Sequence, residues 1–366
     1  MRCMTDAERN VALLFMKTKS GSLGWLPDYF FIPCCFVSKN VVYWSRKRCR
    51  RKEDIMAADN KRNGLIELFR FLCSLWVAYF HGFFPIHSDV FNGVIVPVDF
   101  FFIVAGYFFL KSIEAYRNKP FWEGVRFIFW GRTKRFIVPL IIAASSILLC
   151  NILVKMDLGF NWPLSFLWFF AAQFVYLSLF YLLLKHTKRM RTFNVACVVI
   201  VLVCMSLFKL GIKPLDSPFR GPAMLALGML VSQIPKIRPD LKHAKTAKAL
   251  TVTLNAVGFA VTAAAFIYLA YLPGYAVWKI HTLCCIVFPL FIYFATALPV
   301  RGKFFDLLGE WSIFIYLAQC PILFHHYFVS RDTKDQFPWL CLCAIALFAI
   351  NRAVNAMIRK RKVLQA

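Results

Sequence analysis

The sequence has few charged residues for its length. Only 17% of its 366 residues are Asp, Glu, Lys or Arg, and 60% are hydrophobic, whereas about 25% charged residues is usual in soluble domains. A soluble fold of this size would lack the polar side chains needed to cover its surface. Disorder, a collagen-like fibre and a soluble enzyme are therefore excluded. We predict a membrane protein.

The short motifs of common soluble enzymes are also missing. There is no Gly-x-Ser-x-Gly elbow, no phosphate-binding loop, no His-Glu-x-x-His helix and no His-x4-Asp signature of glycerolipid acyltransferases. No Cys-x-x-Cys or Cys/His zinc spacing occurs, and most of the 13 cysteines lie inside apolar runs. We therefore read the cysteines as small apolar residues and predict no metal site.

Long apolar segments predict an all-α polytopic fold with about ten transmembrane helices. About 20 apolar residues in a helix cross the hydrocarbon core of a bilayer. The predicted spans are 65–86, 91–111, 136–155, 163–184, 193–211, 220–235, 250–272, 276–299, 308–328 and 338–357.

Acidic residues are scarce, with 18 Asp and Glu against 44 Lys and Arg, which gives a net charge of +26. Such an excess suits either nucleic acid or the cytoplasmic loops of a membrane protein. If successive spans cross the membrane in alternating directions from a cytoplasmic start, 35 of the 44 basic residues lie in segments on the cytoplasmic side. This bias predicts that both termini are cytoplasmic. The lipid bilayer is then the expected partner, and no nucleic acid is expected.

The two ends of the chain differ from the apolar centre. A Pro-interrupted apolar stretch precedes a basic run near residue 50, which is the reverse of the order in a signal peptide. We therefore predict that residues 1–60 form an N-terminal extension and that Met56 is the native start. Residues 61–357 would form the membrane domain, and 358–366 a basic cytoplasmic tail.

Ionisable residues inside predicted spans are costly and are functional candidates by default. Arg70 and His81 in the first span are eleven residues apart, which is about three turns plus 20°. Both therefore project from one face and would line a common passage at two depths, Arg70 nearer the cytoplasm. The alternative is an Arg that extends to the membrane surface and a His that is hydrogen-bonded in a packed core.

Asp99 lies among aromatic residues of the second span and needs a partner to remain ionised. His81 is the expected partner, because the first two spans are antiparallel neighbours. A structural pair or a backbone hydrogen bond is the alternative.

Arg132 and Arg135, at i and i+3 before the third span, would place two guanidinium groups on one helical side, where paired N–H donors suit phosphates. Simple membrane-surface charge is the alternative there.

These segments together resemble the acyltransferase-3 family of bacterial multi-span membrane O-acyltransferases. The resemblance covers about residues 61–357 and rests on several motifs in the family's order. These are Arg-x10-His from Arg70, Val-Asp-Phe-Phe-Phe-x-x-x-Gly from Val98, Arg-x-x-Arg-x-x-x-Pro from Arg132, the segment from Phe219 to Gly228 and the segment from Leu308 to Leu317.

The resemblance implies transfer of an acyl group, most often acetyl from acetyl-CoA, to a hydroxyl of an envelope or exported carbohydrate. It implies a multi-pass location in the bacterial inner membrane and polysaccharide-assembly proteins as partners. Acyl-CoA would be a donor substrate, and no cofactor would be bound permanently. His81 matches the expected catalytic residue, Arg70 an essential arginine, and Arg132 and Arg135 the pair associated with the donor.

Arg220 and Tyr316, in the later two segments, are further candidates. The sequence departs from the family pattern at two positions. Ala105 replaces a usual Ser, and Gln319 replaces a common His, so a second histidine in the mechanism is not expected.

In the mechanism that follows, neutral His81 takes the proton of the acceptor hydroxyl, and Asp99 orients it. Arg70 steers the donor arm or stabilises developing negative charge. A proton-coupled transporter or a polysaccharide exporter component is the leading alternative, because such proteins also carry intramembrane Arg, His and Asp. A catalytically inactive scaffold in an envelope-polymer assembly is the second alternative.

Overall fold

The computed structural model describes residues 63–83, 95–134, 136–154, 161–187, 189–210, 216–236, 244–270, 277–328 and 333–364. The chain divides into two units, and all of these residues belong to the second, Asn63–Ala366. The predicted extension 1–60, with its start at Met56, lies outside the described residues and stays a prediction.

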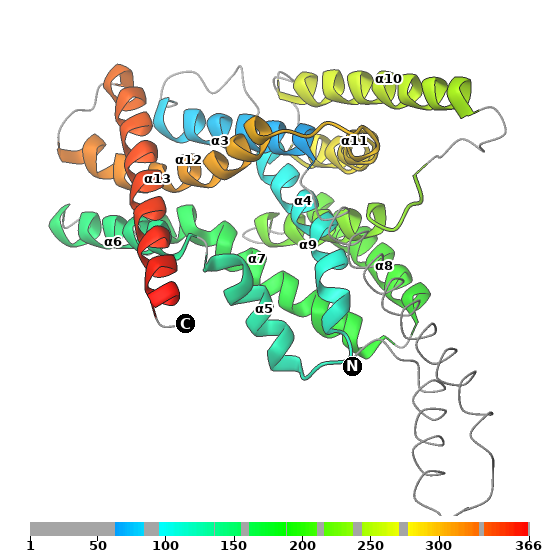
Figure 1. Ribbon diagram of the computed structural model, residues 1–366, viewed down its shortest axis with the longest axis horizontal. Coiled ribbons are helices and arrows are strands. Elements are labelled where there is room, and N and C mark those ends of the chain that lie inside the picture. Colours follow the sequence, from blue (N-terminus) through cyan, green and yellow to red (C-terminus); the bar gives the residue numbers. More distant parts are fainter. Residues whose placement is uncertain are drawn as a thin grey trace, which may run out of the picture. The chain divides into compact units, whose positions relative to one another are not determined.

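The described residues form α-helices and one short 3-10 turn, without strands, so the all-α prediction is confirmed for this part of the chain. The helices are α3 (Gly64–Phe83), α4 (Ile95–Ile113), α5 (Phe121–Thr133), α6 (Ile137–Val154), α7 (Asn161–His186), α8 (Met190–Lys209), α9 (Asp216–Val231), α10 (Ala244–Ala270), α11 (Val277–Ala297), α12 (Lys303–Phe328) and α13 (Thr333–Leu364), with the 3-10 turn η2 at Glu114–Tyr116 (Figure 1).

Six described helices are long and apolar enough to cross a membrane. They contain Val96–Tyr116, Phe169–His186, Met190–Lys209, Ala249–Leu269, Trp278–Ala297 and Pro338–Ile358. Each overlaps one of the ten predicted spans, so the membrane character of the fold is confirmed while the count of ten stays a prediction. The apolar parts of α6 and α9, Ile137–Ser146 and Phe219–Val231, are shorter than a full crossing.

The helices α3 and α12 cover two further predicted spans, 65–86 and 308–328. Both begin with a polar turn that carries charge, Glu67 and Arg70 in α3 and Asp306 and Glu310 in α12. The two helices pack side by side (Figure 1). Of these four residues only Glu67 is buried, whereas Asp306 is exposed.

Two apolar clusters hold the helices together. The larger cluster is centred on α4 and includes buried residues of α3, α7, α8, α9 and α11. The smaller is centred on α12, with α6, α13 and Ala78 of α3. Large apolar side chains on the outer faces of several spans, such as Val195 and Leu202 of α8 and Val261 of α10, are exposed. In a membrane these side chains contact lipid.

Glycines set the closest helix crossing, between α4 and α9. A Cβ atom on Gly106 would lie 2.1 Å from the carbonyl oxygen of Leu225, and one on Gly228 would lie 2.0 Å from that of Ile103. Only hydrogen fits at either position, so the two backbones approach without intervening side chains. This close contact brings α9 against the face of α4 near Asp99.

Phenylalanine rings fill the core next to this crossing. Phe100 packs against Phe266, Phe288 and Phe291, with ring centroids 5.2 to 5.7 Å apart. Phe69 of α3 joins the same group, 4.6 Å from Phe291. Such tilted and edge-on ring pairs add to the gain from apolar burial. The aromatic run after Asp99 thus fixes α4 against α3, α10 and α11.

The segments predicted to lie on the inner side contact one another. Asn63 caps α3 by accepting the backbone N–H groups of Leu65 and Ile66, and its Nδ2 donates to the carbonyl oxygen of Ala295, 2.9 Å away near the end of α11. Lys185, at the end of α7, donates to the carbonyl oxygen of Lys119, 2.8 Å away. These contacts fit the predicted alternation of spans, and the side that faces the cytoplasm stays a prediction.

Candidate active site

A buried carboxylate lies where α4, α9 and α11 meet. Asp99 has 0% of its surface exposed, and Arg220 of α9 donates to its Oδ1 from Nη2 at 2.7 Å and from Nε at 3.1 Å. Both residues are the fifth of their helices, as is His281 in α11. The three helices therefore bring corresponding N-terminal regions to one point.

His281 contacts the other carboxylate oxygen. Its Nδ1 lies 2.6 Å from Asp99 Oδ2, and 1% of the residue is exposed. An ionised carboxylate only accepts hydrogen bonds, so Nδ1 carries a proton, and in the neutral imidazole Nε2 then keeps a lone pair. Phe208 of α8 packs edge-on against the imidazole, with ring centroids 5.1 Å apart. The ring is thus held in one orientation by a hydrogen bond and by packing.

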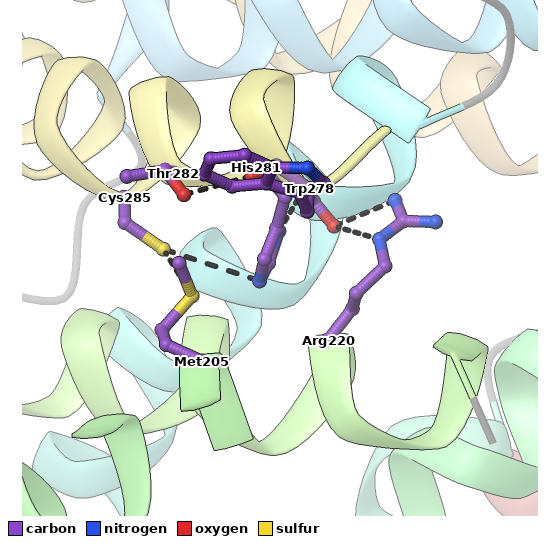
Figure 2. A network of polar contacts seen from close by, with 7 residues as sticks. Met205, Arg220, Trp278, His281, Thr282 and Cys285 are labelled. Atoms are coloured by element: carbon purple, nitrogen blue, oxygen red, sulfur yellow. Dashed lines mark hydrogen bonds and ion pairs between the residues drawn. The ribbon is translucent and has the colours of Figure 1, made fainter. Parts of the chain in front are cut away.

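The free side of the imidazole faces sulfur atoms. Nε2 of His281 lies 4.0 Å from Sγ of Cys285, which itself lies 3.5 Å from Sδ of Met205 (Figure 2). His281 and Cys285 are four residues apart on α11 and therefore share a helix face. Figure 2 shows His281 between Arg220 on one side and the two sulfur atoms on the other.

Charge in this cluster is balanced inside an apolar surrounding. An isolated carboxylate would pay several kcal/mol to leave water, so it needs a cation with good geometry. The two bonds from the Arg220 guanidinium supply one. With the charge of Asp99 matched by Arg220, a neutral imidazole is sufficient at His281, and its basic nitrogen stays available.

The cluster differs from the predicted pairing of Asp99. The structure gives Asp99 two partners, Arg220 and His281, which the sequence analysis did not connect to it. His81, the expected partner, lies in the last turn of α3, and its side chain lies outside the described residues. The catalytic role of His81 stays a prediction. Arg220, named as a further candidate, takes a central place in the site.

The sequence analysis did not select His281 as a candidate, although the sequence around it contains a signal. It lies inside an apolar run that was read as a span, and an intramembrane histidine is a functional candidate by default. The same rule selected Arg70, His81 and Asp99. Nothing in the local sequence, however, pairs His281 with an aspartate 182 residues away.

Arg70 forms an ion pair with a second buried carboxylate. Its Nη1 donates to Oε2 of Glu67 at 2.8 Å, and Glu67 is 2% exposed. Glu67 packs so closely against α12 that a Cβ atom on Gly309 would lie 1.6 Å from Oε2. Gly309 therefore creates the space for this carboxylate. Glu67 was missed, although Glu-x-x-Arg at i and i+3 is a recognised helical ion pair.

The arginines before the third predicted span are only partly described by the structure. Arg132 lies in the last turn of α5, which ends at Thr133, and α6 begins at Ile137. The placement of Arg132 and Arg135 on one helical side stays a prediction. Between the predicted spans 91–111 and 136–155 the chain forms α5, with Gly124 against the ring of Tyr181. The side chain of Arg132 and all of Arg135 lie outside the described residues.

Tyr316 lies between the two apolar clusters. Its ring centroid is 5.9 Å from Phe169 and 5.4 Å from Phe170 of α7. Three residues later, Gln319 is buried, and its Nε2 has no hydrogen-bond partner among the described residues. In the described part of the chain, no three His, Cys, Asp or Glu side chains group closely enough to hold a metal ion.

Comparison with known proteins identifies the domain. The family model of the acyltransferase-3 domain matches residues 63–352. No curated protein and no solved structure matches the chain. The matched region begins at Asn63, the cap of α3, and contains Asp99, Arg220 and His281. Of the six described helices that are apolar enough to span a membrane, it contains five completely and most of the sixth. This chain therefore belongs to the acyltransferase-3 family and is a membrane acyltransferase.

Proposed function

We propose that the protein transfers an acyl group, acetyl in the first instance, from cytoplasmic acyl-CoA to a hydroxyl of a cell-envelope or exported carbohydrate. The observation that carries this proposal is the buried cluster of Asp99, Arg220 and His281 inside the matched domain. An oriented imidazole with a free Nε2 is suited to moving protons during acyl transfer.

The reaction needs a base because a sugar hydroxyl has a pKa far above 7. Neutral imidazole, with an ordinary pKa of about 6.5, takes such a proton at physiological pH. We assign this role to His81, at the predicted outer end of α3. The cluster at Asp99 belongs to the same predicted outer half, because α4, α9 and α11 each begin there. The acceptor would therefore be held on the outer side.

The donor would bind on the inner side. Coenzyme A carries phosphates, and Arg132 and Arg135, before the third predicted span, would supply guanidinium groups for them. Arg70, in the second turn of α3, would stabilise negative charge on the donor arm, with Glu67 holding its guanidinium in place. The excess of basic residues in the predicted inner segments supports attraction of an anionic donor.

This function implies a place in the cell. The protein would lie in the bacterial inner membrane as a multi-pass protein, beside polysaccharide-assembly proteins that supply the acceptor. It would need no permanently bound cofactor, because acyl-CoA arrives as a substrate. The basic residues would serve membrane orientation and donor binding, without a nucleic-acid partner.

The test compares O-acyl groups on envelope carbohydrate in cells that express wild-type protein or variants. We expect His81→Ala to lower O-acylation by about 100-fold or more, because a general base contributes about 10²- to 10⁴-fold. His186→Ala is the matched control, since His186 is exposed at the end of α7. Wild-type cells without O-acyl groups above the deletion strain would contradict the function. Full O-acylation by His81→Ala would contradict the role of His81.

A further inference from the structure

Three side chains near the outer end of α11 are aligned like those of a nucleophilic acyl-transfer site. Sγ of Cys285 lies 4.0 Å from Nε2 of His281, and Nδ1 of the same ring lies 2.6 Å from Oδ2 of Asp99. A thiol, an imidazole and a carboxylate in this order form the working parts of cysteine acyl-transfer enzymes on unrelated folds. The order follows from geometry and does not depend on position in the sequence.

Cys285 differs from the neighbouring cysteine on the same helix. Cys284 is fully buried in the larger apolar cluster, whereas Cys285 is half-buried and lies at the edge of that cluster. The thiol hydrogen of Cys285 has two acceptors in reach, the thioether of Met205 at 3.5 Å and the imidazole of His281. A thioether is a weak acceptor, so imidazole is the stronger base for this proton.

Burial opposes a lone thiolate at Cys285, so this thiol needs a base in contact with it. A lone thiolate among apolar side chains is costly and unreactive. Transfer of its proton to His281 creates a thiolate beside an imidazolium, and Asp99 then stabilises the imidazolium through Nδ1. Arg220, held on the opposite oxygen of Asp99, keeps the carboxylate ionised and fixed.

We propose that Cys285 carries the acyl group between donor and acceptor, with His281 as its base and Asp99 as the positioning residue. This inference rests on the proposed function. Coenzyme A would enter from the predicted cytoplasmic side, with its acyl-bearing arm extending to the cluster in the predicted outer half, where the acceptor binds. A thioester on Cys285 would hold the acyl group where the acceptor hydroxyl arrives.

The two steps balance without a further reactant. First, Sγ of Cys285 attacks the carbonyl carbon of the acyl-CoA thioester while its proton passes to Nε2 of His281. The bond from the carbonyl carbon to the coenzyme A sulfur breaks, and that sulfur leaves with the proton. Second, the acceptor hydroxyl attacks the Cys285 thioester and forms an oxygen ester. The hydroxyl proton, taken by a base, ends on Sγ of Cys285.

The test uses full-length protein in membranes supplied with acetyl-CoA that is radiolabelled in the acetyl group. After brief incubation the protein is denatured, and retained label is measured before and after neutral hydroxylamine, which cleaves thioesters. We expect wild-type protein and the control Cys284→Ala to retain hydroxylamine-sensitive label, and Cys285→Ala to retain none. Transfer of label to carbohydrate should fall by about 100-fold or more in Cys285→Ala at equal protein level.

Two outcomes would overturn the proposal, and they differ from failure of the proposed function. Wild-type membranes that transfer label to carbohydrate without labelled protein would exclude the thioester. Cys285→Ala with wild-type transfer would exclude Cys285 as the carrier. In both cases acyl transfer itself stands. Wild-type membranes that consume no acetyl-CoA and acylate no carbohydrate would contradict the proposed function as well.

Discussion

At Asp99 a carboxylate is removed from water and keeps its charge because neighbouring side chains replace its hydration. The guanidinium of Arg220 occupies one oxygen and the imidazole of His281 the other. Burial of such groups is costly, so the net gain in stability from the complete cluster is small. The loss of one member is more severe, because it leaves a charge without its partner.

A double-mutant cycle tests this balance. Arg220→Gln should lower the free energy of unfolding by about 3–5 kcal/mol, because the charge of Asp99 loses its cation. The double variant Asp99→Asn and Arg220→Gln should cost less than the sum of the two single variants, since it removes both charges. Thermal unfolding of purified protein in detergent measures each value. Additive losses would show that the two residues do not depend on each other.

The space for Glu67 depends on Gly309. In Gly309→Ala the new Cβ would lie 1.6 Å from Oε2 of Glu67, so the carboxylate must move and its bond to Arg70 must break. We expect a lower unfolding temperature and lower acyl transfer. The pair Gly309→Ala with Glu67→Ala should regain stability relative to Gly309→Ala alone, because the clash is gone. The absence of any such recovery would contradict this packing.

The local sequence identifies these residues one at a time but does not connect them. Asp99 was selected as an ionisable side chain in an apolar segment, and Arg220 through the segment from Phe219 to Gly228 that resembles the family. Their pairing was not predicted, since 121 residues separate them and the contact depends on how α4 and α9 cross. The contact of Arg70 with Glu67 is local and was within reach of sequence reasoning. The side-chain position of His81 stays a prediction.

At the scale of the helix, the crossing of α4 and α9 positions the site. Glycines on both helices remove the Cβ atoms that would hold the backbones apart. Arg220 then reaches Asp99 from the first turns of α9. The position of the guanidinium thus depends on residues two turns away from it.

A single methyl group should disturb this crossing. In Gly228→Ala the Cβ would lie 2.0 Å from the carbonyl oxygen of Ile103, so α9 must shift away from α4. Overpacking of this kind costs about 1–3 kcal/mol, and we expect acyl transfer to fall as Arg220 moves. Gly302→Ala is the control, because its Cβ would meet nothing closer than 3.7 Å. Equal unfolding temperatures and activities for the two variants would contradict the close crossing.

Hydropathy predicts helices best where they face lipid on most sides. Five of the six confirmed spans are of this kind, whereas Val96–Tyr116 is mostly buried in the core. The short helix α5 was missed, because aromatic and charged residues alternate in it without a long apolar run. It is stabilised by α7, through the stacked rings of Phe121 and Tyr181 and the close approach of Gly124. Such tertiary support is not visible in a hydropathy pattern.

For the molecule as a whole, orientation in the membrane decides which substrate meets which residue. The cluster at Asp99 forms where three helices begin, whereas Asn63 and the end of α11 meet near the opposite ends. The charge distribution predicts that the second of these sides is cytoplasmic. Donor and acceptor would then approach from opposite sides of one protein.

Reporter fusions test this orientation. Alkaline phosphatase, which is active only outside the cytoplasm, should be inactive when fused after residue 240 or residue 366, and active when fused after residue 274. Green fluorescent protein should give the reverse pattern. We expect this result because segments 236–249 and 358–366 hold nine basic residues. An active phosphatase at the C-terminus would place the donor site on the wrong side.

The most direct measurement follows a labelled acetyl group from acetyl-CoA to carbohydrate in inside-out membrane vesicles, where only the cytoplasmic face meets the added donor. Vesicles with wild-type protein should place label on carbohydrate inside the vesicle, and vesicles with Asp99→Asn at equal protein level should place about 100-fold less. Equal labelling of carbohydrate by wild-type, Asp99→Asn and protein-free vesicles would contradict the account.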